Sequence, residues 1–249
     1  LYLAKALAAR KVKVPIVAWS TTVTTGRQRG LSEVSVSNVR KKVDASVLPV
    51  SALERGLSLC RALFGDRFNQ RPDILAISLS NLNPQNHMGI ALCNLTRMER
   101  GETWGQSANT TPSVGRLLEA LDGERLAIAG AFGHTVRTIK DHFSLSFNVA
   151  PGSVGEMAAA MVARGDGTTG PTTLDTRYVT EDVPFGLHPT VVLGRLAGRP
   201  AVLHEAGVRL FSALYGRDFA AENDLLPALG LDSMTAASLA QLCRDGYAA

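Results

Sequence analysis

One stretch of the sequence combines a histidine with several amides around a proline. It is the segment Asn81-Leu82-Asn83-Pro84-Gln85-Asn86-His87, between an apolar run (74–79) and a helix-like segment (88–100). The histidine is therefore predicted just after a polar break, at the edge between two elements. Histidine is the side chain whose unperturbed pKa lets it give and take protons near neutrality. We predict that His87 is an acid/base group, which requires a partner from elsewhere in the chain.

A second stretch places an arginine and two carboxylates at a junction between a loop and a helix. It is Arg177-Tyr178-Val179-Thr180-Glu181-Asp182-Val183-Pro184-Phe185-Gly186-Leu187. Pro184 suits the first helical position, so Asp182 or Val183 is predicted to cap the helix. Asp is common at helix starts, and the spacing alone does not decide between a cap and a functional carboxylate. Arg177 is likewise either a surface charge or a binding group.

Bulk properties limit the classes of protein to consider. The chain has 249 residues, of which 45% are hydrophobic and 19% charged, which indicates a soluble globular protein with a buried core. The net charge of +4 is mild, and the basic clusters at 10–13 and 40–42 lack interleaved aromatic residues. We therefore expect no nucleic-acid partner. We also expect no membrane span, because the chain has no run of about 18 apolar residues.

The cysteines and acidic groups give no metal-binding pattern. Cys60, Cys93 and Cys243 are an odd number, and no two of them have metal-ligand spacing. All three lie in apolar helical patterns, which predicts reduced, buried thiols and a cytoplasmic protein. No cluster of His, Cys, Asp and Glu has ligand spacing elsewhere, so no metal is predicted.

The elements that must position these residues change character along the chain. A helix (1–9) and a strand (12–19) are typical of the closing piece of an α/β unit. Three β-branched segments follow and are expected to form a small antiparallel addition at the edge of that sheet: 21–25, 33–37 and 42–47. The rest is predicted to be mainly helical. Its expected helices are 51–64, 111–121, 135–147, 154–164, 184–196, 202–215 and 235–244.

We accordingly predict two domains, with residues 1–48 as the C-terminal part of an α/β nucleotide-binding domain. Residues 49–249 are expected to form a helical domain that carries the substrate and catalytic residues. The segment 165–171, which holds two threonines between glycines, is the loosest loop and is predicted to be a lid or a connector.

Taken in order, the two stretches resemble the octopine/nopaline (opine) dehydrogenases. The likeness covers nearly the whole chain and includes Thr180-Glu181-Asp182-Val183-Pro184 and Tyr215-Gly216-Arg217-Asp218-Phe219. The separation of His87 and Asp182 is similar to that between the family's catalytic histidine and aspartate. The resemblance implies a helical C-terminal domain of the 6-phosphogluconate-dehydrogenase-like kind, attached here to the C-terminal remnant of a Rossmann domain.

The resemblance also implies an activity: reductive condensation of an amino acid with a 2-oxo acid such as pyruvate or 2-oxoglutarate. The cofactor is then NAD or NADP, and a homodimer is a possible assembly. By position, His87 is the acid/base, Asp182 its partner, and Arg177 a group that holds a substrate carboxylate. Asn83 would contact substrate, and Asn81 the nicotinamide amide. Both asparagines could equally cap the helix expected to start at Pro84, and for Asn83 the cap is the favoured prediction.

General chemistry agrees with these implied roles. Hydride addition to an imine leaves charge that a proton donor must meet in the transition state. A carboxylate on one imidazole nitrogen fixes the tautomer and favours the form that can donate. The planar guanidinium of arginine binds carboxylates bidentately.

The chain departs from the family in one respect. A Rossmann domain needs a Gly-rich loop between its first strand and first helix, and no G-x-G-x-x-G of that kind exists here. We expect the chain to begin partway through a longer protein, with the cofactor half before Leu1. Alternatives are a related ketopantoate-reductase-like or glycerol-phosphate-dehydrogenase-like enzyme, in which a lysine such as Lys41 or Lys42 is the acid/base, or a non-catalytic helical dimerisation or binding module. His134 and His142 are further acid/base candidates, although a structural role is favoured for both.

Overall fold

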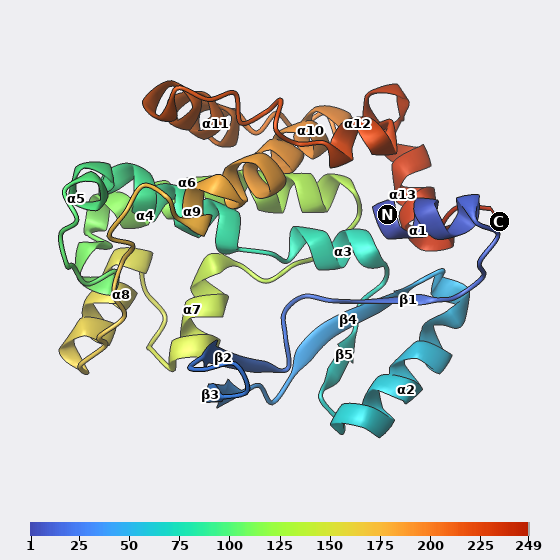
Figure 1. The fold of residues 1–249 in the computed structure, drawn as a ribbon, viewed down its shortest axis with the longest axis horizontal. Coiled ribbons are helices and arrows are strands. Elements are labelled where there is room, and N and C mark those ends of the chain that lie inside the picture. Colours follow the sequence, from blue (N-terminus) through green and yellow to red (C-terminus); the bar gives the residue numbers. More distant parts are fainter. Residues whose placement is uncertain (249) are drawn as a thin grey trace. The chain divides into compact units, whose positions relative to one another are not determined.

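The computed structural model describes residues 1–248 and divides them into two compact units (Figure 1). The first comprises Leu1–Asn81 together with the chain from Ser233 onward, and the second is Leu82–Asp232. This division differs from the domain boundary expected after residue 48. It does so because the elements between residues 50 and 79 pack against the strand that ends at Leu48.

The first unit contains two small sheets and the helix α1 (Tyr2–Ala9). Strands β1 (Ile16–Trp19), β4 (Val43–Leu48) and β5 (Phe68–Gln70) form a three-stranded sheet in the order β1–β4–β5. The pair β1–β4 is antiparallel, whereas β4–β5 is parallel. Strands β2 (Thr24–Gln28) and β3 (Val34–Val39) form a separate antiparallel hairpin.

The expectation of one edge addition from the three β-branched segments is therefore wrong for the third of them. The segment predicted at 42–47 is β4, the central strand, and it is buried at every position except Asp44. Continuous burial is typical of a strand covered on both faces. The apolar residues Val43, Ala45, Val47 and Leu48 match that burial, but a local sequence pattern does not show which strands pair with β4.

Helices cover this sheet through closely spaced contacts. The predicted helix 51–64 is confirmed as a 3₁₀ turn (Val50–Ala52) followed by α2 (Leu53–Phe64), which buries Leu53, Gly56, Leu57 and Cys60. That spacing puts the four residues on one helix face. A Cβ on Gly56 would lie 2.6 Å from Val47, so glycine permits the close approach of α2 to β4. Helices α3 (Ile74–Leu79) and α13 (Ala236–Asp245) also pack on β4.

The three thiols are free but do not share one environment. Cys60 and Cys243 are buried as predicted, and burial raises the pKa of the Cys243 thiol to about 12. Cys93 is exposed, which contradicts the prediction of three buried thiols. It is the last residue of its helix, where the apolar pattern no longer faces the core.

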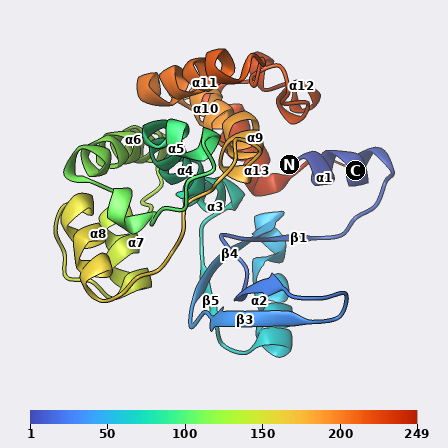
Figure 2. The ribbon, with the colours of Figure 1, turned by 60° about the vertical axis from the view of Figure 1, so that its left-hand side comes forward.

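The second unit is built of helices around the long helix α6 (Pro112–Ala131), which contacts α4, α7, α8, α10 and α11 (Figures 1 and 2). Its helices besides α6 are α4 (Asn83–Cys93), α5 (Leu95–Glu99), α7 (Ile139–Phe147), α8 (Val154–Ala163), α9 (Arg177–Thr180), α10 (His188–Leu196), α11 (Val202–Tyr215) and α12 (Leu225–Leu229). Short turns complete it: two 3₁₀ turns (Ser107–Asn109, Leu231–Ser233) and a π-helical turn (Val183–Leu187).

Predicted helix boundaries hold best where the ends carry local signals. Helix α11 has the predicted bounds, and its C-cap Gly216 adopts the left-handed conformation that favours glycine. Helix α7 begins four residues later than predicted, at a capping box formed by Thr138 and Asp141. Helix α6 continues ten residues past its predicted end, because Ile128 and Ala129 remain fully buried against neighbouring helices.

One hydrophobic cluster joins the elements that carry the two candidate stretches. Its buried residues come from α4, α9, the π-helical turn, α11 and neighbouring segments: Met88, Ile90, Ala91, Met98, Trp104, Leu121, Val179, Val183, Leu187, Val208, Phe211 and Phe219. Trp104 is 4% exposed and belongs to this core. Residues far apart in the sequence are thus held together by the burial of apolar surface.

The segment 165–171, predicted to be a lid or connector, is tied to residues 104–107. The backbone N–H of Gln106 donates to Thr168 and that of Gly170 to Trp104, on either side of an antiparallel bridge between Gly105 and Thr169. The indole N–H of Trp104 donates to the carbonyl of Pro171 at 3.0 Å. These bonds make the segment a connector that is fixed at its centre rather than a loose lid. We call residues 104–107 and 166–171 the strap.

Within residues 1–248, every helix is too short or too polar to cross a bilayer. In the same part of the chain, no three His, Cys, Asp or Glu side chains are grouped as a metal site would require.

A buried hydrogen-bonded pair, Glu124 and His204, holds the start of α11 on α6. The carboxylate of Glu124, from α6, accepts hydrogen bonds from the backbone N–H groups of Leu203 and His204 and, at 2.7 Å, from His204 Nδ1. His204 is buried, and its partner Glu124 lies 80 positions earlier in the chain, so a local sequence pattern could not reveal this pair. Desolvation raises the pKa of Glu124, but the hydrogen bonds from His204 and Leu203 outweigh it and hold the pKa below its usual range.

We predict that Glu124→Gln lowers the free energy of unfolding by about 1–3 kcal/mol at neutral pH, because it removes a charge-assisted cap of α11. A carboxylate with a depressed pKa stabilises the fold above its unfolded-state pKa and loses this effect as pH falls through the folded-state value. The variant should therefore show a flatter loss of stability as the pH falls through the acid range. Urea unfolding across the acid range measures both effects. Glu205→Gln, which removes a surface carboxylate from the same helix, serves as the control. Equal changes in the two variants would contradict the role of Glu124.

Candidate active site

Helix α4 carries His87 and begins earlier than the sequence indicated. Its first residue is Asn83, its N-cap is Leu82, and no side chain caps it. The prediction that Asn83 caps the helix is therefore wrong. Leu82 takes the cap position because it is buried against Val114 and Leu118, and this packing sets where the helix starts. Asn83 is exposed in the first turn, and His87 lies in the second.

A buried polar network fixes α4 on α6 close to His87. Gln85 Nε2 donates to Asp122 Oδ1 at 2.9 Å, and the same carboxylate accepts from Arg125 and from the backbone N–H of Ile139. Asp122 and Arg125 are each about 3% exposed. A buried ion pair needs this kind of complete hydrogen bonding to be tolerated, and once satisfied it permits few alternative arrangements. Gln85 thereby fixes the backbone two residues before His87.

The carboxylate of Asp182 is directed at His87. Asp182 occupies the N-cap position of the π-helical turn, as the sequence allowed, but its side chain makes no capping bond. His87 Nδ1 instead donates to Asp182 Oδ2 at 2.6 Å. Both side chains are about one-fifth exposed, so the pair is neither in bulk water nor sealed in the core. The structure thus brings together the two residues predicted to be partners.

The two backbones that carry this pair are in direct contact. Gly186, in the π-helical turn, lies so close to the ring of Pro84 that a Cβ on the glycine would overlap the Pro84 side chain. On its other side the turn is held by Asn223, whose Nδ2 donates to the carbonyl of Pro184 at 2.7 Å. π-Helical turns are rare and occur often at functional sites. Here the turn brings Asp182 within one hydrogen bond of His87.

Tyr178 is a third member of the site, although the sequence pattern alone gave it no single role. Its ring is stacked on the imidazole of His87, with centroids 3.6 Å apart and planes inclined by 11°. Its hydroxyl donates to Gln106 Oε1 at 2.8 Å. A signal was available, because Tyr178 precedes Asp182 by four positions, the spacing that places side chains on one face of a helix.

The remaining predicted residues, Arg177, Asn81 and Asn83, are exposed. Arg177 is 82% exposed, and its Nε donates to Glu181 at 2.8 Å. Asn81 is exposed just after α3, where its backbone N–H donates to Ser78. The roles of Arg177, Asn81 and Asn83 stay predictions.

The other histidines occupy different surroundings. His142 packs edge-on against Phe143 and Phe147 within α7, and His134 is half-buried after α6. Burial and the nearby Arg195 lower the pKa of His188. His204 is buried and hydrogen-bonded to Glu124. His87 combines a carboxylate partner with partial exposure, whereas the paired His204 is buried.

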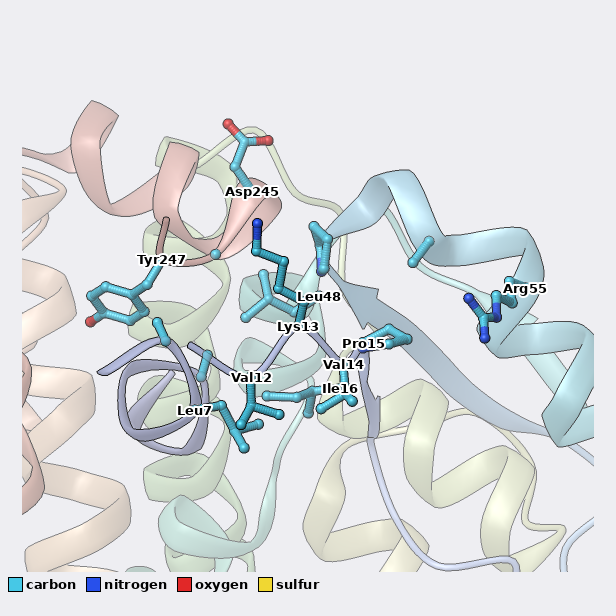
Figure 3. Close-up of a pocket in the computed structure, with 15 residues that line it drawn as sticks. Leu7, Val12, Lys13, Val14, Pro15, Ile16, Leu48, Arg55, Asp245 and Tyr247 are labelled. Atoms are coloured by element: carbon cyan, nitrogen blue, oxygen red, sulfur yellow. The ribbon is translucent and has the colours of Figure 1, made fainter. Parts of the chain in front are cut away.

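A mainly apolar cavity of about 290 Å³ lies in the first unit (Figure 3). Residues of α1, the segment 12–16, the end of β4 and Asp245–Tyr247 line it. None of the predicted site residues does so.

Comparison with known proteins identifies the family. Residues 70–215 match the model of the NAD/NADP octopine/nopaline dehydrogenase α-helical domain. The chain belongs to this family. An opine dehydrogenase from Arthrobacter sp. (strain 1C) is 32% identical over 228 residues, which are 91% of this chain and 63% of that protein. The chain described here thus spans less than two-thirds of that relative's length.

Solved structures share the fold at low identity. An octopine dehydrogenase in complex with NADH and L-arginine has a TM-score of 0.72 at 16% identity, over 90% of this chain and 64% of that one. An apo yersinopine dehydrogenase has a TM-score of 0.68 at 12% identity, over 96% of this chain and 69% of that one. The mainly helical architecture predicted for the second part of the chain is therefore confirmed.

We predict that Gly186→Ala separates His87 from Asp182, because the added methyl group must displace Pro84 and with it the start of α4. Overpacking of this kind costs about 1–3 kcal/mol of stability. A crystal structure of the variant should show a longer Nδ1–Oδ2 distance than the present 2.6 Å. The control is Gly123→Ala in α6, where no atom lies within 4 Å of the new methyl group. An unchanged distance in Gly186→Ala would refute the proposed constraint.

Proposed function

We propose that this protein is an NAD(P)H-dependent dehydrogenase that reductively condenses an amino acid with a 2-oxo acid. The observation that carries the proposal is the hydrogen bond between His87 and Asp182 in a member of the octopine/nopaline dehydrogenase family. Solved octopine dehydrogenases hold NADH with L-arginine or with pyruvate. We therefore expect pyruvate or 2-oxoglutarate as the oxo acid.

In this proposal His87 moves the proton and Asp182 orients it. An ionised carboxylate only accepts hydrogen bonds, so Asp182 keeps a proton on Nδ1 and leaves Nε2 as the nitrogen that faces substrate. Condensation of an amine with a ketone expels water, and that step needs a proton on the departing hydroxyl group. A positioned histidine is the most common donor for such a transfer. The partial exposure of His87 leaves it accessible to a substrate.

Arg177 is proposed to hold a substrate carboxylate. Glu181 engages only the Nε edge of its guanidinium among the bonds of the described residues, which leaves the Nη edge for a bidentate carboxylate. Asn83, exposed on the helix of His87, is proposed as a second substrate contact. Asn81 is proposed to contact the nicotinamide amide.

The reduced nicotinamide would supply the hydride when bound. The described residues do not form a Gly-rich phosphate loop, because Gly26 lies in the β2–β3 hairpin and Gly165–Gly167 leads into the strap. The dinucleotide phosphates are therefore not assigned to this chain. We propose that the first unit is the end of a Rossmann domain. Its parallel strands β4 and β5, joined through α2, form the βαβ unit that such domains repeat.

The alternatives have less support. A lysine-dependent reductase would need Lys41 or Lys42 as its acid/base, and Lys42 lies at an exposed position next to Asp66. A non-catalytic helical module has no use for a partly exposed imidazole held by a carboxylate at 2.6 Å. Substitution of Lys42 and of His87 in turn discriminates between the first alternative and the proposal.

We expect His87→Ala in the intact protein to lower turnover on the order of 10²-fold or more, because it removes the proton donor. Asp182→Asn should act in the same direction through loss of the tautomer lock. Oxidation of NADH or NADPH is followed with pyruvate or 2-oxoglutarate against a panel of amino acids, and circular dichroism checks the fold. His142→Ala is the control. Wild-type turnover in His87→Ala would show that the mechanism is wrong.

We expect Arg177→Lys to raise KM more than it lowers kcat, because lysine keeps the charge but not the planar bidentate geometry. The same assay, run over a range of each substrate, separates the two constants. Arg97→Lys changes a comparable surface arginine that pairs with Glu102 and should leave KM as it is. An unchanged KM for both substrates in Arg177→Lys would remove this residue from the site.

A further inference from the structure

The orientation of the His87 imidazole is not determined by Asp182 alone. One hydrogen bond at Nδ1 fixes one direction in the ring plane but leaves the ring free to tilt about that bond. Burial constrains the ring only in part, since 19% of the His87 side chain is exposed. Proton transfer at Nε2 needs a defined ring plane, because misplacement of a reacting group by about 1 Å can lower the rate 10²-fold.

The ring of Tyr178 supplies the second constraint. A parallel stack at 3.6 Å and 11° blocks the tilt of the imidazole toward the tyrosine and covers one ring face. The two aromatic side chains come from different elements, α4 and α9, which lie side by side in both views (Figures 1 and 2). The stack and the bond to Asp182 act in different directions, so together they define the ring plane.

Tyr178 is itself held from a distance. Its hydroxyl reaches Gln106 at 2.8 Å, and Gln106 belongs to the strap. The strap is rigid because its backbone bonds flank the Gly105–Thr169 bridge and Trp104 is buried in the core. Gly170 packs directly on the Trp104 ring, where a Cβ would overlap it. Rigid support of this kind is what precise placement of a functional group requires.

We propose that Tyr178 is a positioning residue for His87, and that Gln106 holds Tyr178 in place for this purpose. Tyr178 touches neither substrate nor cofactor in this role. It limits the imidazole to the plane in which Nδ1 faces Asp182 and Nε2 faces substrate. The kinetic consequence rests on the proposed function, whereas the effect on the ring of His87 does not.

The test compares Tyr178→Leu, which removes the stack, with Tyr178→Phe, which keeps the ring and removes the hydroxyl that donates to Gln106. The chain has five histidines, so NMR of histidine-labelled protein resolves the ring signals, and loss of a peak in His87→Gln assigns His87. Ring current from Tyr178 should shift the His87 ring protons upfield in the wild type and in Tyr178→Phe, and the shift should vanish in Tyr178→Leu. Tyr178→Leu should lower kcat on the order of tenfold with little change in KM, because position and not binding is lost.

The variant Gln106→Leu tests the role of Gln106 independently. If Gln106 acts through the Tyr178 hydroxyl, Gln106→Leu and Tyr178→Phe should lower kcat equally, and the double variant should be no worse than either. Tyr215 supplies the control, since its hydroxyl donates to Leu174 at 2.9 Å and its ring packs on Phe211 and Phe219, away from His87. Tyr215→Phe should leave the His87 signals and kcat at wild-type values.

The outcomes separate the two proposals. Unchanged His87 signals and wild-type kcat in a folded Tyr178→Leu variant would overturn the positioning role, even if His87→Ala is inactive. Additive losses in the double variant would overturn the part played by Gln106. Altered His87 signals in Tyr178→Leu, in a protein whose His87→Ala variant keeps full turnover, would uphold positioning and refute the proposed function.

Discussion

The second unit of this molecule must hold His87 and Asp182 close enough for the hydrogen bond between them. Its atoms are 2.6 Å apart although the residues are far apart in the sequence and both are partly exposed. A partly exposed ion pair contributes little to stability, so the bond cannot hold its own partners in place. The surrounding structure must impose the distance. It does so through contacts that are buried and costly to break.

Three such contacts act on the same short length of α4. Pro84 abuts Gly186, Gln85 is bonded to Asp122, and Met88 packs into the cluster that also contains Val183 and Leu187. Packed interiors resist small displacements, so these contacts leave α4 little freedom to shift relative to the π-helical turn. The partly open site is thus supported by close packing within one helical turn of His87. That arrangement reconciles access for a substrate with a defined geometry.

Asp182 shows how tertiary contacts override a local preference. An aspartate at a helix start normally accepts from the backbone of its own helix. Here the side chain gives up that bond and accepts from a histidine on another helix. Loss of a local capping bond in favour of a bond to a distant residue is expected at functional sites, where the position of a side chain matters more than the stability of the helix. The π-helical turn that follows is a second departure from regular helix geometry at the same place.

The sequence by itself determined the mainly helical second part, the bounds of α11, the order of the two stretches and the family they indicate. These features follow from apolar periodicity, caps and local motifs, which are properties of neighbouring residues. Only the tertiary structure decided that Asn83 does not cap α4, that β4 is a central strand, that residues 166–171 are fixed to residues 104–107, that Glu124 holds His204 and that Tyr178 stacks on His87. Each of these outcomes depends on which distant side chains meet when apolar surface is buried, and a pattern of near neighbours along the chain carries no record of that choice.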